Sequence, residues 1–324
     1  MTSSNGPAVK PPLFIVFNMG SGHGDAAEAR AAIDAACSAA GRAVHVMVVA
    51  DPQRIDDLAR EAVRLAQRAN GVVVAAGGDG TLNAVAQATL GSGCAFGVLP
   101  HGTFNYFSRT HGIPADTAAA MQVLLHEAAW PVQVGLVNEQ LFLVNASLGL
   151  YPKLLEDREA WKKQLGRSRV VAFAAGLLTM LRGSPNLRLR IDVHGQTHEV
   201  RTPTLFVGNN ALQLEQLGFS AAKAIDRGEL AAITLRPVGR LRILWLLLRG
   251  ALGQLGNADQ VVSFQFRNLV VRRARAVGRR RVKVAIDGEI TWQTQPLRFR
   301  VSPEPLLLIR PAAPAIEVLE GIAS

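Results

Sequence analysis

Cysteine is scarce in this sequence: only Cys37 and Cys94 occur among 324 residues. Both lie in apolar helical or strand contexts, and their spacing matches neither a metal site nor a redox motif. We therefore expect the two thiols to pack in the core of a protein that resides in a reducing compartment.

Long apolar runs are also missing. No window reaches the ~18–20 apolar residues that a membrane-spanning helix needs. The N-terminal stretch MTSSNGPAVKPP lacks the apolar core of a signal peptide. We expect residues 1–12 to form a flexible tail. The protein should be cytoplasmic, and at most peripheral at the inner face of the membrane.

Aromatic residues make up only 6% of the sequence, whereas basic residues are in excess. The formal net charge is +10, from 35 Lys and Arg against 25 Asp and Glu, and most of the excess follows residue 150. A basic half of this kind can meet nucleic acid, an anionic membrane or a phosphorylated substrate. The arginine runs at 272–275 and 279–281 have no recognisable nucleic-acid module beside them, and aromatics for base stacking are few. We therefore expect no nucleic-acid partner.

The first part of the chain alternates short apolar runs with helical patterns. Runs typical of buried strands lie at 13–17, 44–49, 72–76 and 95–99. Helical patterns follow Asp25 and cover 55–69 and 82–90. Strands that alternate with helices predict parallel crossovers, and hence an open, doubly wound α/β sheet.

Beyond Pro131 the pattern changes to segments in which apolar and polar residues alternate. Examples are LRLRIDVHG, HEVRTPTLFVGNN, FQFRNLVVRRA and RVKVAIDGEI. Such segments, separated by turns, predict the antiparallel strands of a β-sandwich-like domain. Helical patterns at 158–182 and 238–255 interrupt them. We place the boundary between the two halves near 131–137.

Three glycine-bearing loops, at 18–24, 77–81 and 100–105, follow predicted parallel strands. The carboxyl ends of such strands form the ligand-binding edge of a doubly wound sheet. Glycines let backbone N–H groups approach an anion, and a following helix adds its positive N-terminal end. Asp79 is the fixed negative charge in the central loop, where a carboxylate can hold a divalent cation or accept a proton. Alone, a GG turn of this kind is as often a plain tight turn.

The order of the motifs is more specific than any single loop. NxxSGxG ends the first strand, GGDGTLN ends the third, LPxGTxN follows the fourth, and DGE lies near the C-terminus. With these motifs the chain resembles the diacylglycerol kinase-like lipid kinases, a family that includes sphingosine and ceramide kinases and many bacterial enzymes. The resemblance covers about residues 13–310. It rests on Asn18, Ser21 and Gly22; Gly77 to Thr81 with Asn83; Pro100, Gly102, Thr103 and Asn105; and Asp287 to Glu289, with softer matches at 147–152, 207–210 and 226–230.

The resemblance implies a nucleotide-binding α/β domain at 13–134 and a β-rich lipid-substrate domain at 135–312, with a C-terminal tail at 313–324. The active site would lie in the cleft between the domains. There ATP and Mg²⁺ would serve to phosphorylate the hydroxyl of a diacylglycerol-like or sphingoid-like lipid.

Individual roles are also implied by the resemblance. Asp79 would hold the metal or accept the hydroxyl proton, and Glu289, with Asp287, would complete the catalytic site from the second domain. Thr103 and Asn105 would line the cleft beside the nucleotide. Contacts to the nucleotide itself would come from Asn18, Ser21, Gly22, Gly78, Asp79, Gly80 and Thr81.

The DGE motif allows two structural interpretations. If Asp287 and Glu289 lie on one strand, their spacing of two places both carboxylates on the same face. Alternatively, DGE is a hairpin turn, since Asp-Gly is a strong turn signal. We favour the strand because of the family resemblance. Phosphoryl transfer needs little more than positioned reactants, neutralised phosphate charge and one or two carboxylates.

Several residues depart from the family pattern. Met19 stands where most relatives have proline. Phe104 replaces a glycine, and Tyr106 replaces an acidic residue that helps to hold the acceptor. These changes favour an altered acceptor or an altered site geometry over diacylglycerol itself. We expect His101, in the same loop, to be a polar loop residue rather than a general base.

Two other functions remain open. One is an NAD kinase, which shares the GGDGT motif and a similar fold. The other is a non-catalytic protein that binds nucleotide or lipid. Apolar helical segments bordered by basic residues, within 158–182 and at 241–248, favour an anionic membrane surface as a partner. Packing of these apolar faces on the sandwich is an equal alternative.

Overall fold

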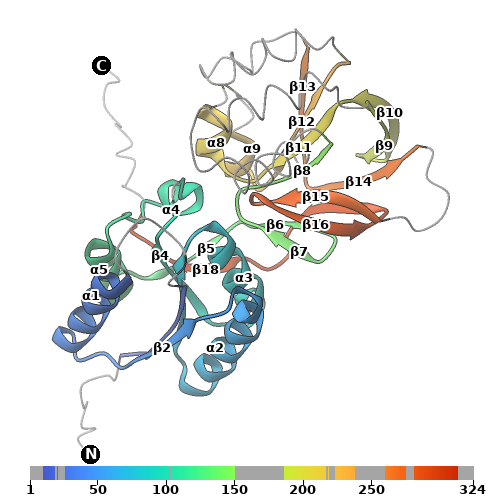
Figure 1. The fold of residues 1–324 in the computed structure, drawn as a ribbon. Coiled ribbons are helices and arrows are strands. Elements are labelled where there is room, and N and C mark those ends of the chain that lie inside the picture. Colours follow the sequence, from blue (N-terminus) through green and yellow to red (C-terminus); the bar gives the residue numbers. More distant parts are fainter. Residues whose placement is uncertain are drawn as a thin grey trace, which may run out of the picture.

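The computed structural model describes residues 10–18, 20, 26–102, 104–149, 186–216, 218, 223–237, 260–274 and 281–312. The described elements form two lobes that lie side by side (Figure 1). The first lobe is an α/β structure and the second is built mainly of β-strands. This arrangement confirms the predicted fold class.

A six-stranded sheet forms the centre of the first lobe, in the order β2-β1-β3-β4-β18-β5. All its neighbouring pairs run parallel except β18 and β5. Its central strand β3, VVVAAG, is buried along its whole length, as the uncharged apolar run predicted. The strands are β1 (Leu13–Asn18), β2 (Val44–Val49), β3 (Val72–Gly77), β4 (Ala95–Pro100), β5 (Ala129–Val132) and β18 (Leu306–Ile309).

Helices cover both faces of this sheet (Figure 1). Helices α1 and α5 pack together on one face, and α2 and α3 pack together on the other. The helices of this lobe are α1 (Ala26–Ala39), α2 (Ile55–Ala69), α3 (Asp79–Thr89), α4 (Tyr106–Thr110) and α5 (Thr117–His126), with a 3-10 turn at Pro52–Arg54. Helices on both faces make the sheet doubly wound, as predicted.

One strand of the first sheet comes from the far end of the chain. Strand β18 lies between β4 and β5, although it belongs to the stretch 135–312 that we assigned to the second domain. Its side chains Leu306, Leu308 and Ile309 are buried in the core of the first lobe. The chain therefore returns to the first lobe after completing the second.

The second lobe consists of two antiparallel six-stranded sheets. The second sheet has the order β10-β9-β14-β17-β6-β7, and the third sheet has the order β13-β12-β11-β8-β15-β16. Alternating residues of both sheets, such as Leu189, Phe299 and Val284, meet in one apolar core. The strands are β6 (Gly135–Val137), β7 (Gln140–Phe142), β8 (Asn145–Gly149), β9 (Leu187–Val193), β10 (Gln196–Thr202), β11 (Thr204–Gly208), β12 (Leu230–Leu235), β13 (Val261–Phe266), β14 (Asn268–Arg273), β15 (Arg281–Ile286), β16 (Glu289–Thr294) and β17 (Leu297–Val301), with short helices α8 (Ala211–Gln216) and α9 (Lys223–Asp226).

Two segments that we predicted as single strands are each split between the sheets. HEVRTPTLFVGNN breaks at Pro203 into β10 of the second sheet and β11 of the third. FQFRNLVVRRA breaks at Arg267 into β13 of the third sheet and β14 of the second. Proline cannot donate to a strand ladder, so Pro203 fits only where a strand ends.

Within the described residues, no helix is both long enough and apolar enough to cross a bilayer. The helical patterns that we predicted at 158–182 and 238–255 lie outside the described part of the chain, as do the tails at 1–9 and 313–324.

Candidate active site

Strands β1 and β3 are neighbours, and the chain leaves β1 towards β2 on one side and β3 towards β4 on the other. Such a point, where the connections diverge, is where doubly wound sheets bind ligands. At the end of β1, Asn18 donates from Nδ2 to Oγ1 of Thr81, 2.9 Å away. The N–H of Gly20 in turn donates to Oδ1 of Asn18, at 3.1 Å. The first and second glycine loops are therefore tied together.

Helix α3 begins directly within the GGDGT motif. Gly78 is extended (φ −82°, ψ −177°) and precedes the helix, no side chain caps the end, and Asp79 lies in the first turn. Our prediction that the helix starts at Leu82 is wrong by three residues. The reason is that the carbonyl of Gly78 already accepts a bond from the N–H of Leu82, at 3.0 Å. The uncapped N–H groups and the helix dipole make this end suited to an anion.

Gly77 must be glycine for the turn to close. A Cβ at this position would lie 2.7 Å from both Cβ and Oγ1 of Thr81, closer than real Cβ atoms approach. The carbonyl of Gly77 also accepts from the N–H of His101, at 2.8 Å, so the third loop is fastened to the second.

The third loop turns at Asn105, which has a left-handed backbone (φ 48°) and donates from Nδ2 to the carbonyl of Gly102 at 2.9 Å. Asn105 and His101 line a cavity of about 400 Å³ on the side of α1 and α5, together with Asn18. Asn105 is absent from the lining of the larger cavity that contains Asp79. Its predicted place in the cleft beside the nucleotide stays a prediction.

His101 behaves as a partly buried polar residue. Its Nε2 lies 3.3 Å from Oγ1 of Thr117, and its ring meets Phe17 edge-on, with centroids 5.9 Å apart. Burial lowers the pKa of His101. Close by, the rings of Phe104 and Tyr106 stack in parallel, with centroids 6.0 Å apart. Two of the three departures from the family pattern thus form one aromatic pair.

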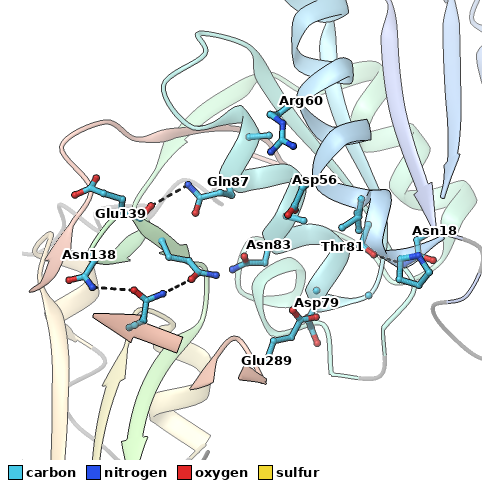
Figure 2. A pocket seen from close by; sticks show the side chains of 18 residues that line it. Asn18, Asp56, Arg60, Asp79, Thr81, Asn83, Gln87, Asn138, Glu139 and Glu289 are labelled. Atoms are coloured by element: carbon cyan, nitrogen blue, oxygen red, sulfur yellow. Dashed lines mark hydrogen bonds between the residues drawn. The ribbon is translucent and has the colours of Figure 1, made fainter. Parts of the chain in front are cut away.

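The larger cavity has a volume of about 1180 Å³ and lies between the two lobes (Figure 2). The first lobe contributes residues of β1, the 3-10 turn, α2 and α3, and the second lobe contributes residues around the β6–β7 turn and β16. The lining residues are Asn18, Pro52, Ile55, Asp56, Arg60, Gly78, Asp79, Gly80, Thr81, Asn83, Ala84, Gln87, Ala88, Asn138, Glu139, Gln140, Glu289 and Gln293.

Asp79 and Glu289 reach this cavity from opposite lobes (Figure 2). Glu289 begins strand β16 and lies against the first turn of α3, where a Cβ on Gly80 would overlap its Oε1. A larger residue at position 80 would force the Glu289 carboxylate to move away from the start of α3. The structure therefore brings together two carboxylates that are 210 positions apart in the sequence.

Asp287 is placed differently from our prediction. Asp287 (φ 46°) and Gly288 (φ 90°) are the two turn residues between β15 and β16, so Asp287 does not share a strand face with Glu289. The strand interpretation is wrong, because a two-residue turn with both φ values positive is the form that Asp-Gly favours. The carboxylate of Asp287 is held by Asn83 and by three backbone N–H groups of residues 143–145.

Burial and the negative charge of neighbouring carboxylates raise the pKa values of Asp79 and Glu289. Burial, followed by the negative charge of Asp287, raises the pKa of Asp79 to about 6. Glu289 is open to the cavity, yet desolvation of its carboxylate raises its pKa, and Asp287 and Asp56 add to the rise. A carboxyl group with a pKa near neutrality can exchange protons at working pH, which is the property expected of an acid–base group.

The sequence predicted the cavity residues that belong to the glycine loops, together with Glu289. It did not predict the amide side chains that line the opposite side of the cavity. There Gln87 of the first lobe contacts the β6–β7 segment of the second lobe, and Gln293 contacts the same segment from within the second lobe. Gln293 donates to Oε1 of Gln140 at 2.7 Å and accepts from Asn138 at 3.1 Å, and Gln87 accepts from the N–H of Leu141 at 2.7 Å. Isolated amides carry no motif, so only the fold could place them. Asp56 and Arg60, one turn apart on α2, were also missed.

Other predictions lie outside the described residues. Ser21, Gly22 and Thr103, which we predicted to contact the nucleotide or line the cleft, belong to this group, as does Met19. In the described part of the chain, no three His, Cys, Asp or Glu side chains gather into a ready-made metal site. The metal role of Asp79 stays a prediction.

Comparison with known proteins finds one family model that resembles the first part of the chain. Residues 12–137 match the family model described as "Diacylglycerol kinase catalytic domain". Over 143 residues the chain is 43% identical to a Pseudomonas aeruginosa protein named "Probable lipid kinase YegS-like", covering 43% of this chain and 45% of the relative. An uncharacterised Synechocystis protein is 25% identical over 271 residues, or 79% of this chain and 60% of the relative.

Solved structures match over almost the whole fold. A crystal structure of a diacylglycerol kinase from Bacillus anthracis strain Sterne has a TM-score of 0.67 at 19% identity, covering 93% of this chain and 97% of the other. At this identity the likeness concerns the fold alone. The curated relatives above are matched over about half of their own length. Together with the family model, these matches confirm the predicted resemblance.

Proposed function

We propose that this chain is an ATP- and Mg²⁺-dependent lipid kinase, because residues 12–137 match the model of the diacylglycerol kinase catalytic domain. The reaction transfers the γ-phosphate of ATP to a hydroxyl of a diacylglycerol-like or sphingoid-like lipid. The observation that carries this proposal is the meeting of Asp79 and Glu289 in one cavity between the lobes. A protein that binds a nucleotide but catalyses no reaction does not need two such carboxylates.

The residues of the cavity fit a nucleotide triphosphate with its metal. The uncapped start of α3, with Gly78 and Gly80, offers N–H groups to phosphate oxygens. Asn18 and Thr81, already bonded to each other, would border the same phosphates. Asp79 would supply a carboxylate oxygen to Mg²⁺, which takes few protein ligands and completes its shell with water and phosphate oxygens. When bound, the metal would neutralise charge on the transferred phosphoryl group.

We assign the proton acceptor to Glu289. Its carboxylate is open to the cavity, sits beside the start of α3, and has a raised pKa. It would take the proton of the lipid hydroxyl as the oxygen attacks, a contribution worth roughly 10²–10⁴-fold in rate. Asp79→Asn should increase the Mg²⁺ concentration needed for activity, whereas Glu289→Gln should lower kcat at an unchanged Mg²⁺ requirement. The opposite pattern would exchange the two roles.

A single assay separates this function from its rivals. Purified protein with labelled ATP and Mg²⁺ is offered mixed micelles of diacylglycerol, monoacylglycerol, ceramide and sphingoid bases, and separately NAD. Label in one of the lipids supports the proposal. Label in NAD alone would establish an NAD kinase, and bound ATP without transfer would establish a non-catalytic protein.

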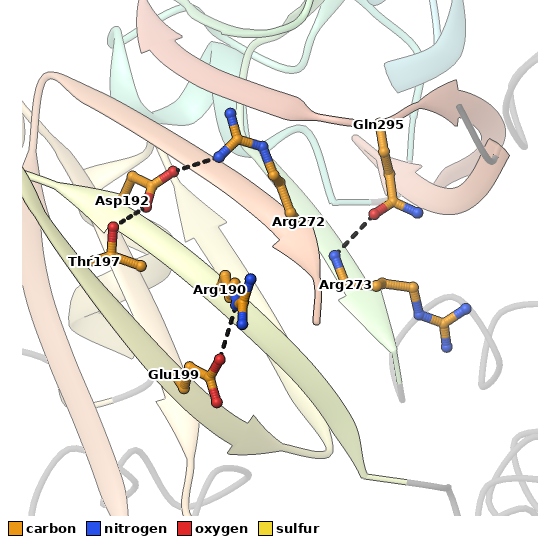
Figure 3. Close-up of polar contacts among 7 residues, drawn as sticks. All are labelled: Arg190, Asp192, Thr197, Glu199, Arg272, Arg273 and Gln295. Atoms are coloured by element: carbon orange, nitrogen blue, oxygen red, sulfur yellow. Dashed lines mark hydrogen bonds and ion pairs between the residues drawn. The ribbon is translucent and has the colours of Figure 1, made fainter. Parts of the chain in front are cut away.

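We also propose that the protein binds the surface of anionic membranes. The apolar segments that suggested this partner lie outside the described residues, but the outward face of the second sheet offers support (Figure 3). On this face Arg190 stands directly opposite Arg272, and Arg188 opposite Arg201. Like charges opposite each other destabilise a sheet. Glu199 and Asp192 offset this in part, pairing with Arg190 at 2.8 Å and with Arg272 at 3.0 Å.

Cosedimentation with vesicles tests this partner independently of catalysis. We expect the protein to bind phosphatidylglycerol vesicles at low salt and not to bind phosphatidylcholine vesicles. Arg201→Glu should weaken binding, because each basic residue near the surface adds about 1 kcal/mol. Arg68→Glu, an equal charge change on α2, is the matched control. Equal loss in both variants would indicate a net-charge effect rather than this face.

A further inference from the structure

The carboxylate of Asp287 lies at a junction of three chain segments. Oδ2 accepts from Nδ2 of Asn83 and from the N–H of Leu143, both at 2.7 Å. Oδ1 accepts from the N–H groups of Val144 and Asn145, both at 2.9 Å. The backbone N–H of Asp287 donates to the carbonyl of Asn145, at 2.9 Å. A carboxylate has about four acceptor positions, so these four donors use its whole capacity.

This saturation argues against a direct part in the reaction. All four neighbours are N–H donors, so an added proton on either oxygen would face a donor rather than an acceptor. A metal ion or a substrate hydroxyl would have to displace at least one of these bonds. Burial raises the pKa of Asp287 and the four bonds oppose the rise. The bonding pattern fits the ionised form, held by charge-assisted bonds.

The partners of Asp287 belong to the parts that carry the two proposed catalytic carboxylates. Asn83 lies on α3, one turn after Asp79, and donates to the carbonyl of Leu141 as well. Residues 143 and 144 connect β7 of the second sheet to β8 of the third sheet, which begins at Asn145. Glu289 follows Asp287 by two residues, on the far side of the turn. One carboxylate thus joins helix α3, the connecting segment and the β15–β16 hairpin.

We infer that Asp287 is a positioning residue that fastens the β15–β16 hairpin to helix α3 and thereby keeps Glu289 against Gly80. The effect on catalysis rests on the proposed function, whereas the attachment of the hairpin to α3 does not. The left-handed turn lets the Asp287 side chain point back to the connecting segment while the chain continues into Glu289. A shift of about 1 Å at a reacting group can cost about 10²-fold in rate.

Asparagine cannot replace Asp287 in this arrangement. Its oxygen could accept from one pair of donors, but its NH₂ group would then face the N–H donors on the other side. Asp287→Asn tolerates the left-handed turn, so it isolates the hydrogen bonding from the backbone conformation. Asn83→Leu removes a single donor from the other end of the junction. His194→Ala is the matched control, because His194 (φ 49°) and Gly195 (φ 76°) form an equivalent turn between β9 and β10.

The test combines hydrogen exchange with kinetics. In Asp287→Asn, the amides of Leu143, Val144 and Asn145 should exchange at least tenfold faster, while amides of β3 and β9 keep their rates. For lipid phosphorylation, kcat should fall roughly 10–100-fold, as for other supporting residues of catalytic groups, while KM for ATP changes less than threefold. Asn83→Leu should give a smaller change in the same direction, and His194→Ala none.

Two results would overturn the inference. Unchanged exchange of the three amides in Asp287→Asn would show that the carboxylate does not hold this segment. Faster exchange with undiminished kcat would show that the junction does not position Glu289. Exchange is measured on the protein without substrate, so a wild-type protein that phosphorylates no lipid would refute the proposed function and leave the structural half of the inference tested on its own.

Discussion

At the scale of single residues, a substitution at the contact between Gly80 and Glu289 should change activity and stability in different directions. Gly80→Ala should lower kcat by roughly 10–100-fold, because the new Cβ occupies the place of Glu289 Oε1. The same change should leave the melting temperature equal or higher, since alanine favours a helix over glycine by about 1 kcal/mol. Turnover and thermal unfolding of the purified variant measure the two effects.

A double variant checks that Gly80 acts through Glu289. If it does, Gly80→Ala combined with Glu289→Gln should be no slower than Glu289→Gln alone. Additive losses would mean that the methyl group disturbs the phosphate end of the cavity instead, and would contradict this account of the contact.

We expect the buried carboxylate of Asp79 to lower the free energy of unfolding at neutral pH, although it is needed for turnover. Its pKa rises from 3.8 to about 6 on folding, so the folded chain binds more protons than the unfolded chain between these values. Stability from this group is therefore lost as the pH rises from about 4 to 6. Asp79→Asn should abolish most turnover and, at pH 7, raise the free energy of unfolding by up to about 3 kcal/mol.

Urea unfolding of both proteins at pH 7 and pH 4 measures this effect. The difference between variant and wild type should be large at pH 7 and small at pH 4. An equal difference at both values would mean that Asp79 is not the source.

At the scale of elements, helix α4 carries a second titration effect of opposite sign. Its C-terminal neighbour His111 packs edge-on against Phe107, with ring centroids 4.8 Å apart. Burial, followed by the nearby charge of Arg310, lowers the pKa of His111 to about 4. The unfolded chain then binds more protons between pH 4 and 6.5, so stability falls as the pH decreases through this range.

In His111→Gln, the decrease in the free energy of unfolding on acidification should be smaller than in the wild type by up to about 3 kcal/mol. The measurement compares the free energies of unfolding at pH 7.5 and pH 4.5. His198→Gln, the same substitution at an exposed position on β10, is the matched control. A wild-type slope in His111→Gln would contradict the assignment.

The elements also show which structural information the sequence contains locally. The four parallel strands and helix α2 lie where the apolar periodicity predicted them, because a buried strand or an amphipathic helix is defined by its own residues. The start of α3 was misplaced, since glycines that signal a turn also allow a helix to begin inside it. The DGE hairpin was misread because a spacing of two suits a strand as well as a turn.

Long-range pairing explains the remaining differences. Nothing within HEVRTPTLFVGNN states that β10 and β11 join different sheets, apart from Pro203 itself. The site shows the same difference between local and long-range information. The glycine motifs, which are local, predicted Asp79 and Gly80, whereas Glu289 was predicted from the family resemblance. The amide contacts of Gln87 and Gln293 join segments that are far apart in the sequence, so they have no local signal.

At the scale of the whole molecule, the return of β18 makes the first lobe depend on the end of the chain. Strand β18 fills the place between β4 and β5, with Leu308 fully buried. A fragment of residues 10–134 should therefore fail to fold cooperatively, because β4 and β5 lose their shared partner. Fusing residues 303–312 to this fragment through a flexible linker should restore a thermal transition. A cooperative transition in the fragment alone would contradict this dependence.

The central claim is that Asp79 from the first lobe and Glu289 from the second form one phosphotransfer site. The most direct measurement is the initial rate of ³²P transfer from ATP to lipid in mixed micelles, for wild type, Asp79→Asn, Glu289→Gln and the double variant. We predict transfer by the wild type, a loss of at least 10²-fold in each single variant, and no further loss in the double variant. Transfer at near wild-type rates in either single variant would contradict the claim.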